Sequence, residues 1–226
     1  MIVIRKIDAR MRIEQIGIVP SIRPAVRASA PDDARFAAET LNSAGISIAE
    51  INMTVPGAID VISHLAKNFP EMIVGADLLD LETARRCLDA GAKFLTSPGL
   101  ILELVEFALG RDVAVLPGAL TPSEAIRAWN AGADFVKVFP CSQMGGAGYI
   151  KELHATLPQV PLVASGGVNQ QTASNFILAG ATALTIGAEL IPQEALRWRK
   201  EEQIHELARR FLTMVKDGRA QRMERA

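Results

Sequence analysis

Lys137 is the residue whose surroundings most clearly indicate chemistry. It is the one charged residue in the apolar run 135–139, Phe-Val-Lys-Val-Phe, which is followed by Pro140. Alternate side chains of a strand share a face, so Lys137 is expected beside Phe135 and Phe139. Burial among them disfavours the ammonium form and leaves an amine that can attack a ketone to form a Schiff base. The alternative is a lysine that extends past the strand end into water.

A short pattern that recurs four times predicts where this lysine lies. The dipeptide Ala-Gly precedes an apolar run at Gly45, Gly91, Gly132 and Gly180, at intervals of 41 to 48 residues. Glycine in this place is typical of a helix end, and the apolar run after it is typical of a buried strand. The interval suits two strand and helix units, so four repeats predict eight units.

The chain as a whole alternates between apolar runs and helical stretches. We expect strands at 16–22, 46–51, 72–76, 92–96, 113–116, 134–138, 161–164 and 182–186. We expect helices at 31–44, 57–68, 81–90, 100–109, 122–131, 147–156, 170–179 and 201–217, several with Pro, Asp, Thr or Asn start signals. Strict alternation over eight units predicts an α/β protein with a (β/α)8 TIM barrel. An open doubly wound sheet would not explain a repeat on alternate strands.

The repeat also predicts the barrel interior. The residue five places after each repeated glycine is polar, namely Glu50, Thr96, Lys137 and Thr185. The residues two places earlier (Ile48, Phe94, Phe135, Ala183) and four places earlier (Ile46, Ala92, Ala133, Ala181) are apolar. Period-two geometry places all twelve inside, in three layers of four with the polar layer at the active end. Strands two and six lie opposite each other, so Glu50 and Lys137 are predicted to meet over the barrel axis.

A structural ion pair is the alternative explanation of that meeting. A buried pair is a poor source of stability, because desolvation of both charges can exceed their attraction. We therefore favour a functional pair.

Composition limits the class of protein. With 226 residues and 49% hydrophobic content, the chain is expected to form a single barrel domain over 1–226, with a short N-terminal extension. The basic segment 216–225 is expected to be a solvated tail. Net charge is −1 and the pI about 6.3, which predicts no nucleic acid or anionic membrane partner.

Localisation and metal content are predicted from similar signals. Residues 1–5 are too short for a signal peptide and no apolar stretch approaches a membrane span, so we expect a cytoplasmic protein. Cys87 and Cys141 do not indicate a disulfide framework. The three histidines lack metal-ligand spacing, and although Glu50 and Asp77 offer carboxylates, we expect neither a metal nor a cofactor.

Two glycine turns predict an anion site. Strand seven ends in Ser165-Gly166-Gly167, and strand eight is followed by Gly187-Ala188-Glu189. Glycines after the last two strands let backbone N–H groups approach a phosphate, where many barrels bind one. Glu189 would repel a phosphate unless it begins the next helix and faces outward.

The chain resembles the 2-keto-3-deoxy-6-phosphogluconate (KDPG) aldolase family, which includes 4-hydroxy-2-oxoglutarate aldolases, over nearly its whole length. The matching motifs are Ile22-Arg23, 50–56, Val74-Gly75-Ala76, Ser97-Pro98-Gly99, Pro117-Gly118, 121–124, 135–140 and 165–168. The resemblance implies a class I aldolase barrel in which Lys137 forms the imine and Glu50 is the general acid/base. It also implies a homotrimer without metal.

The activity implied is cleavage of a 2-keto-4-hydroxy acid, with KDPG as the expected substrate, to pyruvate and glyceraldehyde 3-phosphate. Lys137 and Glu50 are the expected catalytic residues. The expected substrate-binding residues are Arg23, Thr54, Thr96, Pro117, Ser165, Gly166, Gly167, Gly187 and Ala188.

Four positions depart from the family pattern. Asp77-Leu78 stands where Gly-Thr is usual, which removes a hydroxyl that contacts the keto acid, and Ala188 stands where a serine binds phosphate. Thr54 occupies a position where many members have arginine. A phosphosugar isomerase or epimerase without imine chemistry, or a barrel that only binds a ligand, are the alternatives.

Overall fold

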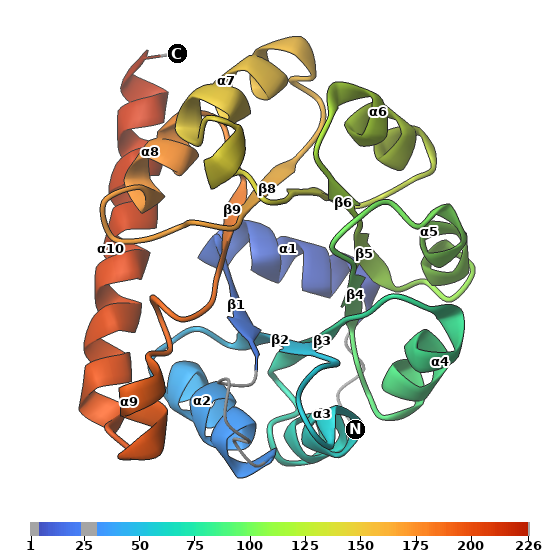
Figure 1. The fold of residues 1–226 in the computed structure, drawn as a ribbon, viewed down its shortest axis with the longest axis vertical. Helices are drawn as coiled ribbons and strands as arrows, with labels where there is room; N and C mark the ends of the chain where they lie inside the picture. Colours follow the sequence, from blue (N-terminus) through green and yellow to red (C-terminus); the bar gives the residue numbers. More distant parts are fainter. Residues whose placement is uncertain (1–4, 24–30, 226) are drawn as a thin grey trace.

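The computed structural model describes residues 5–23 and 31–225, which form a barrel of parallel strands surrounded by helices (Figure 1). The strands are β1 (Ile18–Ile22), β2 (Ile48–Asn52), β3 (Ile73–Asp77), β4 (Phe94–Thr96), β5 (Ala114–Leu116), β6 (Gly118–Ala119), β7 (Val136–Val138), β8 (Leu162–Ser165) and β9 (Ala183–Ile186). The helices are α1 (Lys6–Ile16), α2 (Pro31–Ser43), α3 (Ala58–Asn68), α4 (Leu81–Asp89), α5 (Leu102–Leu109), α6 (Pro122–Asn130), α7 (Ala147–Thr156), α8 (Ala173–Leu178), α9 (Gln193–Arg197) and α10 (Glu201–Arg225), with the short 3-10 helix η1 (Ser142–Met144) before α7. The eight expected strands and eight expected helices are all present.

The sheet closes through its fifth barrel strand, which is interrupted at Pro117. The strand order is β5-β4-β3-β2-β1-β9-β8-β7-β6, and all pairs are parallel. β5 and β6 lie on either side of Pro117, so the two ends of that order are one stretch of chain. The predicted (β/α)8 barrel is therefore confirmed.

The helices that begin after the carboxyl ends of the strands start with the sequence signals that were expected. The Asp80 side chain accepts a hydrogen bond from Thr83 N at the start of α4. At the start of α6, Thr121 and Glu124 form a reciprocal capping box with Pro122 in the first turn. These caps fix the loops that carry side chains to the barrel mouth.

Two hydrophobic cores flank the strands, one inside the barrel and one between the strands and the helices. The predicted middle layer is confirmed, since Ile48, Phe94, Phe135 and Ala183 all belong to the inner core. The predicted lowest layer is wrong, since Ile46, Ala92, Ala133 and Ala181 belong to the outer core. These four residues precede their strands, where the chain has not yet entered the barrel wall.

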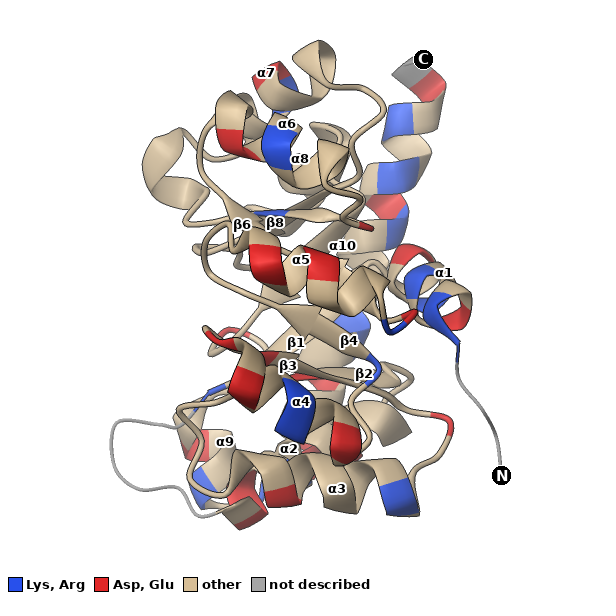
Figure 2. Cartoon of the chain, turned by 90° about the vertical axis from the view of Figure 1, so that its right-hand side faces the viewer, with Lys and Arg blue, Asp and Glu red and all other residues tan. Residues whose placement is uncertain are grey.

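Helix α1 fills the space that this layer was expected to fill. Its Ala9 and Ile13 are fully buried in the inner core. Lys6 forms an ion pair with Asp134, just before β7, and Arg12 donates to Ser47, just before β2. The helix therefore crosses the amino ends of the strands, as Figure 1 shows, and closes the end opposite the mouth. Figure 2 shows charged residues along α1, α3, α4 and α10.

The basic C-terminal segment is part of a helix and not the expected solvated tail. α10 continues from Glu201 to Arg225. Arg219 donates to the carbonyls of Gln15 and Thr182, and Arg222 donates to those of Ile177 and Ala181. The arginines thus satisfy carbonyl groups at the ends of α1 and α8, which orders the segment.

No helix among the described residues is both long enough and apolar enough to span a membrane.

Candidate active site

The catalytic pair predicted from the repeat meets at the mouth of the barrel. Lys137 on β7 and Glu50 on β2 are almost fully buried, and Lys137 Nζ lies 3.3 Å from Glu50 Oε2. Residues 136 and 138 face the outer core, as alternation requires, so the lysine side chain enters the interior. The prediction that these two residues face each other across the axis is confirmed.

Two hydroxyl groups hold the Glu50 carboxylate in place. Ser21 on β1 donates to Oε1 at 2.8 Å, and Thr96 on β4 donates to Oε2 at 2.9 Å. Lys137 Nζ also lies 3.5 Å from Thr96 Oγ1. Both carboxylate oxygens therefore have a fixed donor, and Oε2 is directed at the amine.

Asp77, at the end of β3, is a second carboxylate on the same amine. The sequence indicates Asp77 only as a possible metal ligand and as a departure from a family motif. It is not among the predicted site residues. Its Oδ1 lies 3.6 Å from Lys137 Nζ and 3.3 Å from Thr96 Oγ1, and its Oδ2 accepts from Asn52 at 2.7 Å. Asp77 is only 4% exposed. Asp77 lies two residues after Gly75 and four after Ile73 on the same strand, so alternation predicts that all three point to the same face. This is the signal that could have identified Asp77.

The environment of the amine differs from the expected one. Phe135 does lie on the same interior face, but the Nζ atom itself contacts Glu50, Asp77 and Thr96. Nucleophilic attack therefore requires that a proton leave Nζ, and Glu50 Oε2 is an acceptor within reach.

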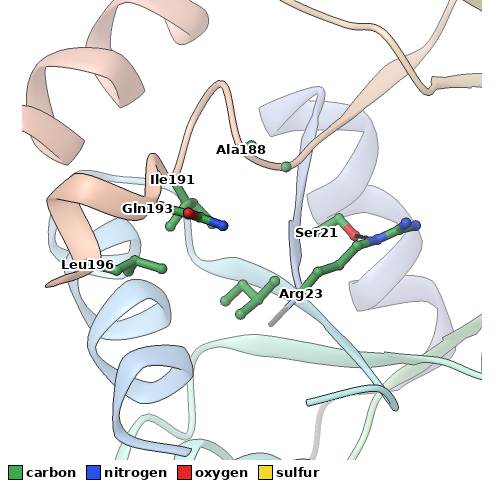
Figure 3. Close-up of a pocket in the computed structure, with 8 residues that line it drawn as sticks. Ser21, Arg23, Ala188, Ile191, Gln193 and Leu196 are labelled. Carbon is green, nitrogen blue, oxygen red and sulfur yellow. Dashed lines mark hydrogen bonds between the residues drawn. The ribbon is translucent and has the colours of Figure 1, made fainter. Parts of the chain in front are cut away.

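Arg23 and Phe139 divide the mouth into two pockets. Arg23 lies with its guanidinium carbon 5.9 Å from the Phe139 ring centroid, and its Nη2 is 3.6 Å from Asp77 Oδ2. Its Nε donates to Ser21 Oγ at 3.4 Å. Figure 3 shows Ser21 and Arg23 directed away from Leu196 on α9. Among the described residues, Arg23 is the cation that lines both pockets and that an anionic ligand would meet in either of them.

The glycine-side pocket contains most of the predicted anion-binding residues. It is lined by Ser21, Arg23, Phe139, Ser165, Gly166, Gly167, Val168, Thr185, Gly187, Ala188 and Glu189. Gly166 and Gly167 have φ values of 87° and 80°, and a Cβ atom at Gly167 would lie 2.2 Å from the Ser142 Cβ. Glycine is thus required at both positions. Glu189 is exposed and lines this pocket, and the expectation that it begins the next helix is wrong, since α9 starts at Gln193.

The carboxylate-side pocket lies over β2 and β3. It is lined by Arg23, Asn52, Met53, Thr54, Asp77, Leu78, Leu79, Asp80, Thr83, Pro98 and Phe139. Thr54 is exposed there, and its backbone N–H donates to Asn52 Oδ1. Pro117 lines neither pocket; its carbonyl accepts from Lys137 N at 2.9 Å and so fixes the backbone of the lysine.

The nearby cysteine has a structural environment. Cys141 is buried and its Sγ donates to the Gly166 carbonyl at 3.2 Å. Burial raises the pKa of the Cys141 thiol to about 11, which keeps it protonated at neutral pH. Within 5–23 and 31–225, no cluster of three His, Cys, Asp or Glu residues is arranged to hold a metal ion.

Comparison with known proteins gives the same family as the sequence motifs. The family model for KDPG and KHG (2-keto-4-hydroxyglutarate) aldolases matches residues 8–207. A KHG/KDPG aldolase of Escherichia coli is 29% identical over 173 residues, covering 76% of this chain and 81% of the relative. A 2-dehydro-3-deoxy-phosphogluconate aldolase of Pseudomonas aeruginosa is 26% identical over 209 residues, covering 92% and 95%.

A solved structure adds a chemical comparison. The KDPG aldolase of Legionella pneumophila, captured with pyruvate as a covalent carbinolamine intermediate, is 25% identical, with a TM-score of 0.79 over 88% of this chain and 96% of that one. Because the family model spans most of the described barrel, the chain belongs to the KDPG and KHG aldolase family.

Proposed function

We propose that this protein is a class I aldolase in which Lys137 is the imine-forming residue and Glu50 the general acid/base. The observation that carries the proposal is the buried amine 3.3 Å from a carboxylate that two hydroxyl groups hold in place. A structural relative that holds pyruvate as a carbinolamine supports the same chemistry, since a carbinolamine precedes an imine.

The proposed cycle begins with proton transfer from Lys137 to Glu50. The neutral amine attacks the C2 ketone to form a carbinolamine, and Glu50 returns the proton to the hydroxyl, which leaves as water. Glu50 then removes the proton of the C4 hydroxyl, the C3–C4 bond breaks, and its electron pair passes to the iminium nitrogen to give an enamine and an aldehyde. Protonation of the enamine at C3, followed by addition of water at C2, releases pyruvate and the amine.

The substrate we propose is KDPG, which gives pyruvate and glyceraldehyde 3-phosphate. The glycine-side pocket, with its left-handed Gly166-Gly167 turn beside Arg23, is the support from the structure for a phosphorylated end. The names of the Escherichia coli and Pseudomonas aeruginosa relatives point to the same compound class.

The direct test is to trap the imine. The protein is incubated with pyruvate and borohydride, digested, and mapped by mass spectrometry. We expect one pyruvate adduct, at Lys137, with Lys93, just before β4, as the unmodified internal control. An adduct at another lysine, or none on folded protein, would contradict imine chemistry and favour an isomerase, an epimerase or a ligand-binding barrel.

We also propose a cytoplasmic homotrimer. A designed cage built from symmetric oligomeric domains matches this fold with a TM-score of 0.82 and 26% identity, which supports an oligomeric family member. A phosphorylated sugar acid is charged and does not cross a membrane unaided, so its aldolase belongs where that substrate is retained. Sedimentation analysis and cell fractionation test the two statements, and a monomer or a secreted protein would contradict them.

A further inference from the structure

Thr185, on β9, is the member of the polar layer that binds no other described side chain. Glu50, Thr96 and Lys137 are joined by hydrogen bonds of 2.9 to 3.5 Å. The Thr185 hydroxyl is buried, with the residue only 6% exposed, and it has no hydrogen-bond partner within residues 5–23 and 31–225. A buried hydroxyl without a partner is unfavourable, so this group is explained by a partner that residues 5–23 and 31–225 do not supply.

The position of Thr185 indicates what that partner is. Thr185 lies on β9, which is separated from β7 and its Lys137 by the single strand β8. Its direct neighbour across the sheet is Ser165. Thr185 and Ser165 both line the glycine-side pocket together with the Gly166-Gly167 turn. The proposed function places the aldehyde half of the substrate in this pocket, so that half is the part that Thr185 would meet.

The side chain of Thr185 limits the chemistry of the group that it would bind. A neutral hydroxyl is suited to Thr185 Oγ1, because each can donate and accept a hydrogen bond.

We propose that Thr185 is a specificity-determining residue that hydrogen-bonds a hydroxyl group of the aldehyde half of the substrate. The inference rests on the proposed aldolase function and deepens it. It assigns the protein to substrates derived from sugar acids, whose aldehyde half bears a hydroxyl, over short dicarboxylic substrates whose aldehyde half is glyoxylate.

The test measures condensation of pyruvate with three aldehydes: glyceraldehyde, propanal, which lacks both hydroxyls, and glyoxylate. The wild-type enzyme is expected to prefer glyceraldehyde. Thr185→Val keeps the shape and removes the hydroxyl, and we expect its kcat/KM for glyceraldehyde to fall about tenfold, the effect of one hydrogen bond, with propanal unchanged. Thr185→Ser is expected to restore most of the loss. Thr182→Val, just before the same strand, is the matched control and should change neither value.

Trapping of the pyruvate adduct at Lys137 distinguishes failure of the proposed aldolase function from failure of the proposed role of Thr185. With the adduct present in wild type and in Thr185→Val, an unchanged preference for glyceraldehyde over propanal in the variant overturns the role of Thr185 alone. An equal loss with both aldehydes also overturns it, because the effect would then be structural. A wild-type preference for glyoxylate overturns the assigned substrate class. Absence of the adduct in wild type overturns the aldolase function and the inference together.

Discussion

The two sides of the barrel mouth are built from different chemical groups. The β2 and β3 side carries the carboxylates Glu50 and Asp77, both buried and both within 3.6 Å of Lys137 Nζ. The β8 and β9 side carries backbone glycines and the hydroxyls of Ser165 and Thr185. Arg23 and Phe139 lie between them. One side is therefore equipped to move protons, while the other is equipped to hold the far end of a substrate.

This asymmetry predicts a direction for the substrate. Two carboxylates, Asp77 and Asp80, line the carboxylate-side pocket and repel an anionic group, whereas one carboxylate, Glu189, and the Gly166-Gly167 turn line the glycine-side pocket. Arg23 lines both pockets. We therefore expect the phosphorylated end to extend toward β8 and β9. The predictions below test each side separately.

The largest effect is expected from Glu50→Gln, which removes the proton carrier from the carboxylate side. The amide keeps the size of the side chain, so the fold is expected to persist. Aldol turnover should fall about a hundredfold or more, the value of a general acid/base, while the pyruvate imine still forms more slowly. Steady-state kinetics and borohydride trapping measure the two steps. Turnover near that of wild type would assign the proton transfers to another group, with Asp77 the first candidate.

A smaller effect of opposite sign is expected from Asp77→Asn. The carboxylate of any 2-keto acid bonded at Nζ lies close to Asp77, where two like charges about 5 Å apart repel by roughly 3 kcal/mol at an effective dielectric of 20. We expect the pyruvate concentration for half-maximal adduct formation to fall about tenfold, which allows for partial screening. Glu189→Gln, which changes an exposed carboxylate on the other side, is the control and should have little effect. A rise in that concentration would show that Asp77 assists imine formation.

Ala188→Ser tests the glycine side by adding a hydroxyl to its pocket. A hydrogen bond to a charged group contributes about 1.5–3 kcal/mol, or roughly ten- to a hundredfold in binding. The ratio of kcat/KM for KDPG to that for its unphosphorylated form should rise, by the lower end of that range because Ala188 is exposed. An unchanged ratio would show that position 188 does not contact the phosphate.

The smallest effect is expected from chelation. The protonated imine withdraws the electrons that a metal would otherwise withdraw, so EDTA should leave the turnover of the enzyme unchanged. Activity is measured after dialysis against EDTA, with and without added divalent ions. Loss that a divalent ion restores would mean that the two carboxylates bind a metal.

Local patterns in the sequence were sufficient to predict the barrel and the meeting of the two residues that we propose for catalysis. The Ala-Gly repeat predicted the strand count, and period-two alternation predicted the middle and polar layers of inward-pointing side chains, since both depend on neighbouring residues. Alternation failed for the lowest layer, whose residues precede the strands. Glu50 and Lys137 could be paired because strands two and six are opposite in any eight-stranded barrel.

The elements that the sequence did not reveal depend on contacts between distant segments. Helix α1 buries only Ala9 and Ile13, so it has no wide apolar face to mark it as the cover of the barrel end. In α10, Gly218 is a residue type typical of a helix end, yet here a Cβ atom would lie 2.9 Å from Ile177 Cβ. The glycine allows close packing on α8, and the helix continues to Arg225.

The sequence by itself determined the fold class, the family and the two residues proposed for catalysis. Only the tertiary structure placed Asp77 on the amine and showed that the Thr185 hydroxyl has no partner among the described residues. The physical reason is that alternation along one strand decides whether a side chain points inward. Which groups it then contacts depends on the register and curvature of strands that are far apart in the chain.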